Sequence, residues 1–101
     1  MEDIEIKQID FEQALNDLRE KGKTEFSSHE LIQRFAANAE REYITMLYDK
    51  LNTDHPFQAV HLQIGRELER LQSDLHIEKT RKDKSINIFG NEDVVQYWRF
   101  I

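Results

Sequence analysis

Cysteine is absent from this chain of 101 residues, so the sequence offers neither a disulfide nor a thiolate ligand for zinc. That absence fits a reducing compartment, and we expect a cytoplasmic protein. No apolar run approaches the length that a bilayer requires, so we expect no membrane-spanning segment. The acidic start, Met-Glu-Asp-Ile-Glu, is unlike the basic start of a signal peptide, so we do not expect export.

Proline and glycine are also scarce, because the chain has one proline and three glycines. No linker, internal repeat or low-complexity tract divides it. At this length we expect one domain over residues 1–101, large enough for a single core. Residues 1–8, in which Ile4 and Ile6 alternate with polar residues, are predicted to form either a short strand or a flexible arm.

Charge is abundant but of mixed sign, with 20 acidic residues against 14 basic ones and a net charge of −6. This balance disfavours nucleic acid, because phosphate neutralisation supplies much of the free energy of DNA binding. A basic segment nevertheless runs from Lys79 to Lys84 and holds four bases and one acid. A local basic segment on an acidic body is compatible with DNA and equally with a protein partner.

The first helix is predicted over residues 10–21, where apolar residues recur at helical spacing. Asp10 is placed to act as its N-cap, and Gly22 to end it as a left-handed residue. Residues 24–26 are then a candidate for a very short strand.

Ser27 and Glu30 have the spacing of a capping box, which predicts that a helix starts at residue 28. The apolar stripe that follows keeps its helical register to residue 51. Residues 28–51 are therefore either one long helix or two shorter helices with a break near Ala37 and Asn38.

The second half of that stretch is apolar on two faces. Tyr43 and Met46 continue the first stripe. The second face consists of Ile44, Leu47, Tyr48 and Leu51. Either this end is more deeply buried in the domain, or its second face binds a second copy or another protein.

A helix is predicted over residues 56–72, with Pro56 in its first turn. Apolar and polar residues then alternate on both sides of the basic segment, which predicts a hairpin over residues 75–89 with residues 79–84 as its turn. Residues 92–101 are either a short helix or a third strand, because Val, Tyr, Trp and Phe favour strands.

This order of elements resembles the winged helix-turn-helix superfamily. The resemblance is carried by the helix start Phe26–Glu30, the helix from Pro56 to Leu71 and the hairpin from Leu75 to Phe89. It implies an α+β, mainly helical fold with three or four helices and a C-terminal β-hairpin wing. It also implies that the helix over 56–72 enters the major groove of DNA while the hairpin lies along the backbone.

Polar residues on the outer face of that helix and in the basic segment suit base edges and phosphates. The candidates for DNA contact are Gln63, Arg66, Arg70, Lys79, Arg81, Lys82 and Lys84. A simpler interpretation is that surface helices and hairpin tips are ordinarily polar, and Glu67 and Glu69 would repel phosphate.

Motifs for catalysis are lacking, since there is no phosphate loop, nucleophile elbow or nucleotide fingerprint. The four histidines do not have metal-ligand spacing, so we expect no enzyme, no metal and no cofactor. His61 is predicted to be partly buried and hydrogen-bonded. Gly65, in mid-helix, is predicted to allow the close approach of another helix. Trp98 is predicted to close the core or, alternatively, to anchor a partner.

The leading functional hypothesis is a small DNA-binding or transcription-regulatory protein that acts as a dimer. The rival is a protein-interaction or oligomerisation module that uses the same fold without nucleic acid. A third possibility, an all-helical accessory subunit, requires residues 75–101 to be helical.

Overall fold

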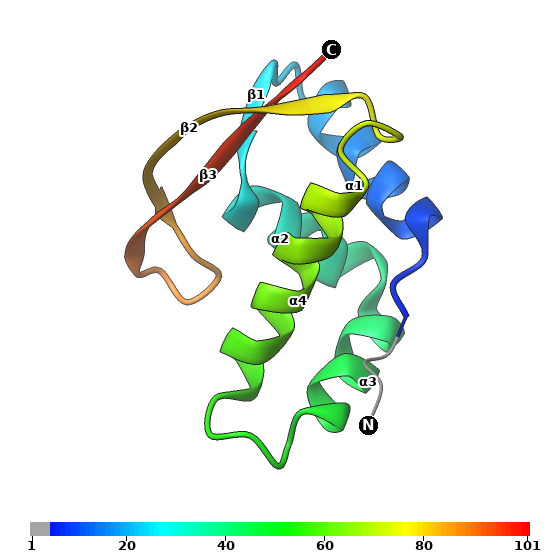
Figure 1. Ribbon diagram of the computed structural model, residues 1–101, viewed down its shortest axis with the longest axis vertical. Helices are drawn as coiled ribbons and strands as arrows, with labels where there is room; N and C mark the ends of the chain where they lie inside the picture. Colours follow the sequence, from blue (N-terminus) through cyan, green and yellow to red (C-terminus); the bar gives the residue numbers. More distant parts are fainter. Residues whose placement is uncertain (1–4) are drawn as a thin grey trace.

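The computed structural model describes residues 5–101, which form four helices and a three-stranded antiparallel sheet (Figure 1). In chain order the elements are α1 (Gln8–Glu20), β1 (Glu25–Ser27), α2 (Ser28–Asn38), α3 (Glu40–Asp49), α4 (Pro56–Arg70), β2 (Ile77–Ile86) and β3 (Glu92–Phe100). The sheet order is β1-β3-β2, so the C-terminal hairpin is joined to the short strand that precedes α2. The predicted α+β fold with a C-terminal hairpin is confirmed, and the strands rule out the all-helical alternative. Within residues 5–101, no helix is both long enough and apolar enough to cross a bilayer.

α1 begins before Asp10, because Lys7 occupies the N-cap position with an extended backbone and no side-chain cap. The prediction of Asp10 as the cap is wrong; it lies in the first turn, where a carboxylate still interacts favourably with the helix dipole. Gly22 ends the helix as predicted, with a φ of +78°. The Lys23 N–H then donates to the Leu18 carbonyl at 3.2 Å, which satisfies one of the last carbonyls of the helix.

Residues 28–49 form two helices, as in the second of the two alternatives. The predicted capping box opens α2, since the Ser27 hydroxyl accepts from the Glu30 N–H and the Glu30 carboxylate accepts from the Ser27 N–H, both at 3.1 Å. The break falls at Ala39, whose φ of −109° and ψ of 53° are not helical. Ala39 is buried, so the change of direction occurs inside the core and lets both helices contribute to it.

A single core joins all of the elements. Its largest fully buried side chains are Trp98, Phe11, Phe26, Phe35, Leu15, Leu18, Leu31, Met46, Ile64, Leu68, Ile77 and Val60. α4 buries Val60, Ile64 and Leu68 in this core, whereas Phe57 at its start is 42% exposed. The core therefore fixes α4 along its length and leaves its first turn available for other contacts.

The hairpin differs from the prediction in the position of its turn. Residues 79–84 are part of the long strand β2, and the chain turns at residues 87–91 instead. Asn87 Oδ1 accepts from the Phe89 and Asn91 N–H groups, and Gly90 has a φ of +81°. This side-chain hydrogen bonding, together with a glycine in the left-handed region, is typical of a turn. The basic residues lie on an edge strand, where charge discourages unwanted pairing.

A bulge interrupts the pairing of β2 with β3. Lys79 lies opposite Trp98 and Lys82 opposite Gln96, so two residues of β2 face only Tyr97. The Gln96 side-chain amide donates to the Arg81 carbonyl at 3.0 Å and so satisfies a group that the bulge leaves outside the ladder.

For both ends of the chain, the sequence was compatible with two alternative structures. Residues 92–101 form a strand over Glu92–Phe100, so the strand alternative is confirmed. The predicted arm or strand at residues 1–8 lies partly outside the described residues, which begin at Glu5. Residues 5–7 are neither helix nor strand, and Ile6 is buried in the core.

Candidate functional site

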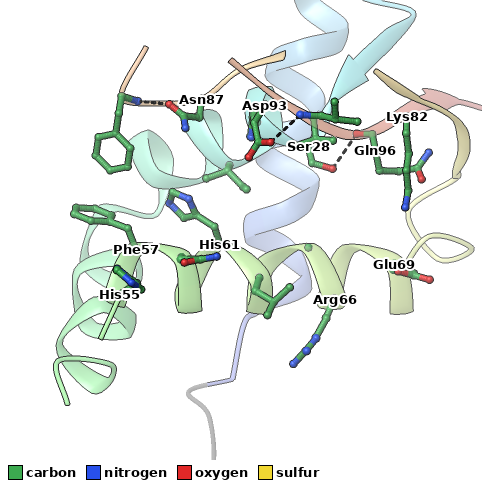
Figure 2. A pocket seen from close by; sticks show the side chains of 18 of the residues that line it. Ser28, His55, Phe57, His61, Arg66, Glu69, Lys82, Asn87, Asp93 and Gln96 are labelled. Carbon is green, nitrogen blue, oxygen red and sulfur yellow. Dashed lines mark hydrogen bonds between the residues drawn. The ribbon is translucent and has the colours of Figure 1, made fainter. Parts of the chain in front are cut away.

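A groove of about 820 Å³ lies between α4 and the hairpin. One wall is α4, and the other is the part of β3 from Asp93 to Gln96; the first turn of α2 also lines it. Figure 2 shows that His61 rises from α4 into this space, while Lys82 points into it from the hairpin. The groove is large enough for a peptide segment or a small ligand.

One end of the groove is aromatic. Phe57, in the first turn of α4, meets Phe89 of the hairpin turn edge-on, with 4.8 Å between the ring centroids. Phe89 and Val94 are 54% and 58% exposed, although both are large apolar residues. Exposed apolar side chains that gather at one concave site are typical of a binding surface.

The other end of the groove is charged. Lys79 Nζ lies 2.7 Å from a carboxylate oxygen of Glu69, so this pair neutralises itself across the groove. Among residues 5–101, the Lys82 side chain has no hydrogen bond or ion pair. Lys82 is therefore an available positive charge inside the groove.

The bulge determines which basic residue enters the groove. It places Lys82 on the same face of the hairpin as Gln96, and Arg81 on the opposite face. There Arg81 Nη1 donates to both carboxylate oxygens of Glu25, at 2.6 and 2.8 Å, and its guanidinium lies 4.6 Å from the centre of the Tyr97 ring. Hydrogen bonding to Glu25 raises the pKa of Arg81 further, so this cation stays engaged within the molecule.

The other candidates for DNA contact are scattered. Gln63 and Arg70 lie on α4 outside the groove, and Lys84 lies on β2 within 3.6 Å of Glu92. Arg70 makes a two-point ion pair with Glu67, and its hydrogen bonds lower the pKa of that carboxyl group.

Arg66 lines the outer rim of the groove, and in Figure 2 its side chain points away from the hairpin. Like that of Lys82, its side chain makes no ion pair or hydrogen bond within residues 5–101. The structure thus brings together three of the seven candidates at the groove, Arg66, Lys79 and Lys82, and only Arg66 and Lys82 are unpaired.

His61 is partly buried and hydrogen-bonded, as predicted. Its Nε2 lies 2.6 Å from the Tyr43 hydroxyl, and the two rings stack. Burial, with a smaller contribution from His29, lowers the pKa of His61, so the ring that shares this hydrogen bond with Tyr43 is neutral at pH 7. Burial also raises the pKa of Tyr43 to about 12. The pair is a polar link between α3 and α4, and its His61 ring lines the groove.

Gly65 does not allow another helix to approach, so that prediction is wrong. A Cβ atom built on Gly65 would have nothing within 4 Å, and the residue lines the groove instead. Glycine in mid-helix costs about 1 kcal/mol relative to alanine, and no packing inside the molecule requires it here. Its position leaves the backbone of α4 accessible from the groove.

The proposed partner face on α3 is divided. Ile44 and Tyr48 on α3 are 56% and 75% exposed, and Leu51, in the turn that follows α3 and continues this face, is 63% exposed, whereas Leu47 packs against the core. Trp98 is 2% exposed, and its indole N–H donates to the Ser28 hydroxyl at 3.0 Å. Trp98 therefore belongs to the core, and the exposed α3 face keeps three of the five proposed contact residues.

The groove contains residues that the sequence did not single out, namely Phe89, Asp93, Val94 and Gln96. All four follow residues 79–84, which were wrongly predicted to be the hairpin turn. The Asn87–Asn91 turn and the β-favouring residues after it were the signals that could have located this wall.

Comparison with known proteins adds no assignment, because neither a family model, nor a curated protein, nor a solved structure matches the chain.

Proposed function

We propose that this chain is a winged-helix-like interaction module that binds a segment of a protein partner in the groove between α4 and the hairpin. The observation that carries the proposal is the exposure of Phe57, Phe89 and Val94 at one concave site. Burying these side chains against a partner would gain roughly 25 cal/mol for each Å² of apolar surface removed from water. The cysteine-free sequence favours a cytoplasmic setting for this activity.

Charge supports a protein partner over DNA at this site. Lys79, Arg81 and Lys84 are paired with carboxylates, and the hairpin turn carries an exposed phenylalanine where a DNA-binding wing would carry a cation. Asp93 also lines the groove and would repel a phosphate.

The test is a selection from a random peptide library displayed on phage, with the purified protein as the target. We expect a family of related peptides whose binding is lost in Gly65→Trp, because the indole would fill the groove from the α4 wall. Arg70→Trp, on the same helix but outside the groove, is the matched control and should bind normally. Recovery of no related peptides, or equal binding by Gly65→Trp, would refute the proposal.

A second candidate function is DNA binding by a dimer, in line with the winged helix-turn-helix resemblance. It is favoured by Arg66, an unpaired cation that α4 directs away from the hairpin, where a DNA major groove could reach it. The exposed face of Ile44, Tyr48 and Leu51 would join the two copies.

The test of DNA binding is a gel-shift with mixed duplex DNA at two salt concentrations. The DNA proposal expects binding that weakens as salt rises and that weakens further in Arg66→Gln, because a phosphate or base contact is removed. Binding that is absent at low salt, or unchanged in Arg66→Gln, would exclude this role for α4.

A further inference from the structure

If the proposed function holds and the groove binds a protein segment, the structure also indicates the conformation of that segment. We propose that the groove accepts an extended peptide that pairs with the open edge of β3 as an additional strand. Its apolar side chains would lie against Phe57 and Val94, and a carboxylate would lie at Lys82. Addition of a strand to an exposed sheet edge is an established way for domains to bind peptides.

The edge of β3 is open over half of its length. β2 pairs with β3 from Phe100 to Glu92, whereas β1 pairs only with Tyr97, Trp98 and Arg99. Residues 92–96 therefore have a partner strand on one side only. Their other side is where an added strand would continue the line of β1.

The backbone groups of Val94 and Gln96 point to that open side. Along an antiparallel strand, alternate residues hydrogen-bond to opposite neighbours. Ile101 donates to His76 and Asn87 donates to Asn91, so odd-numbered residues of this segment bond toward β2. Phe100 instead donates to Thr24, on the β1 side.

Side chains take the place of a missing strand at these positions. The Val94 N–H is satisfied by Oδ1 of the neighbouring Asp93, at 2.9 Å. The Gln96 carbonyl accepts from the Ser28 hydroxyl at 3.0 Å. Figure 2 shows both bonds along the rim of the groove. A peptide backbone could replace the Asp93 side chain as the partner of Val94.

The open edge faces the groove. Residues 93–96 all line it, and so do Ser28 and His29, which directly follow β1 and therefore lie on the side of β3 that is away from β2. Across the groove, Gly65 leaves the α4 backbone uncovered, which gives a second chain room to pass.

The dimensions of the two walls agree. An extended segment that pairs with residues 92–96 would have about five residues and a length of roughly 17 Å. From Phe57 to Glu69, the wall formed by α4 extends for roughly 18 Å at the helical rise. The segment would therefore meet the aromatic end near Glu92 and Lys82 near Gln96, which lies opposite it in the sheet.

These positions define the chemistry of the peptide. Side chains on one face of an extended segment occur at every second residue, so the required pattern is apolar, any, apolar, any, acidic. Duplex DNA does not fit the same space, because its phosphates would meet Phe89 and Asp93.

The probes are two synthetic peptides with blocked ends, Ile-Thr-Val-Thr-Glu-Thr and its reverse Thr-Glu-Thr-Val-Thr-Ile, since either strand direction can pair. The measurement is amide NMR of the full chain during titration to millimolar peptide. We expect one peptide to cause saturable shifts at Gly65, Val94 and Gln96. Replacing its Glu by Gln should weaken binding roughly two- to fivefold, because the contact with Lys82 is lost. The absence of these shifts with both peptides would overturn the proposal.

Val94→Pro tests the pairing itself. Proline removes the N–H that points to the open edge and is tolerated on edge strands. We expect at least roughly tenfold weaker binding, whereas Val94→Ala, which keeps the N–H, should bind much more strongly than Val94→Pro. Equal binding by Val94→Pro and Val94→Ala would show that strand addition is wrong.

Lys82→Gln supplies an independent test that leaves the β3 backbone unchanged. It should abolish the preference for Glu over Gln in the peptide, and Lys84→Gln, outside the groove, should preserve it. A Glu preference that persists in Lys82→Gln would contradict the assigned contact.

Gly65→Trp and Val94→Pro together separate loss of the groove from loss of strand pairing. Peptides selected on the protein that are lost in Gly65→Trp but bind Val94→Pro normally would keep the groove as a binding site and exclude strand addition. If Gly65→Trp also binds them normally, the groove itself is excluded.

Discussion

Phe89, in the turn of the hairpin, lies edge-on against Phe57 in the first turn of α4, with ring centroids 4.8 Å apart. This contact fastens the far end of the hairpin to the helix beside it. A wing that reaches for DNA would instead project its turn into solvent. The pair thus closes one end of the groove and sets its width.

Removing the Phe89 ring should loosen the hairpin. We expect Phe89→Ala to lower the free energy of unfolding by about 1 kcal/mol, the usual contribution of an aromatic pair, and to speed amide hydrogen exchange in β2 and β3. Denaturant titration and exchange NMR measure the two effects. Ile86→Ala, which removes an exposed apolar residue nearby, is the control. Unchanged exchange in Phe89→Ala would mean that the contact does not hold the hairpin.

Two glycine substitutions should act in opposite directions. We expect Gly65→Ala to raise the free energy of unfolding by about 1 kcal/mol, because alanine is the better helix former and the added methyl group meets nothing. Gly22→Ala should lower it by about 1 kcal/mol, because Gly22 has a φ of +78°. Thermal or urea denaturation gives both values. A destabilised Gly65→Ala would show that the position is constrained from within the fold.

The His61–Tyr43 pair should make the protein sensitive to acid. The folded state holds the pKa of His61 below its ordinary value of about 6.5, so the unfolded chain binds the proton first as pH falls. Stability is therefore fully present above that value and is lost as pH falls through the lower pKa of the folded state. His61→Gln, whose amide can still hydrogen-bond to the Tyr43 hydroxyl but does not titrate, should flatten this part of the curve.

Urea denaturation between pH 7 and pH 5 measures the effect, and His55→Gln serves as an exposed control. If the free energy of unfolding falls equally between pH 7 and pH 5 in His61→Gln and in the unmodified protein, another group is responsible.

At alkaline pH, the raised pKa of Tyr43, about 12, predicts a loss of stability above pH 10 that Tyr43→Phe removes.

The exposed face of α3 should support self-association. Tyr48 is 75% exposed between Ile44 and Leu51, and a charge at its centre would be buried without a partner in a dimer. We expect Tyr48→Glu to raise the dimer dissociation constant by roughly tenfold or more, measured by sedimentation equilibrium. Gln13→Glu adds the same charge on α1 and should have little effect. A chain that is monomeric at every concentration would rule out this face as a dimer contact.

Helix positions were predictable because their signals are local. The capping box at Ser27 and the left-handed Gly22 each involve residues within one turn, and the structure has both. Asp10 shows the limit of such signals, because the helix begins two residues earlier, after Lys7, although aspartate is the better N-cap residue.

The groove was not predictable from the same signals. Charge in Lys79–Lys84 suggested a turn, but the polarity of an edge strand and that of a turn look alike in a sequence. Which backbone groups of β3 remain open depends on how far β1 extends beside it, and β1 is only three residues long. Periodicity within one segment carries no information about that pairing.

The bulge in β2 lets two consecutive side chains, Thr80 and Arg81, donate to the same carboxylate, that of Glu25. A deletion of Thr80 would restore regular pairing, with Arg81 opposite Tyr97 and Lys82 still opposite Gln96. The hairpin would then lose one hydrogen bond to Glu25, while the ammonium group in the groove and the strand pairs on both sides of the bulge would stay in place. A change in the length of β2 at this point is thus absorbed locally.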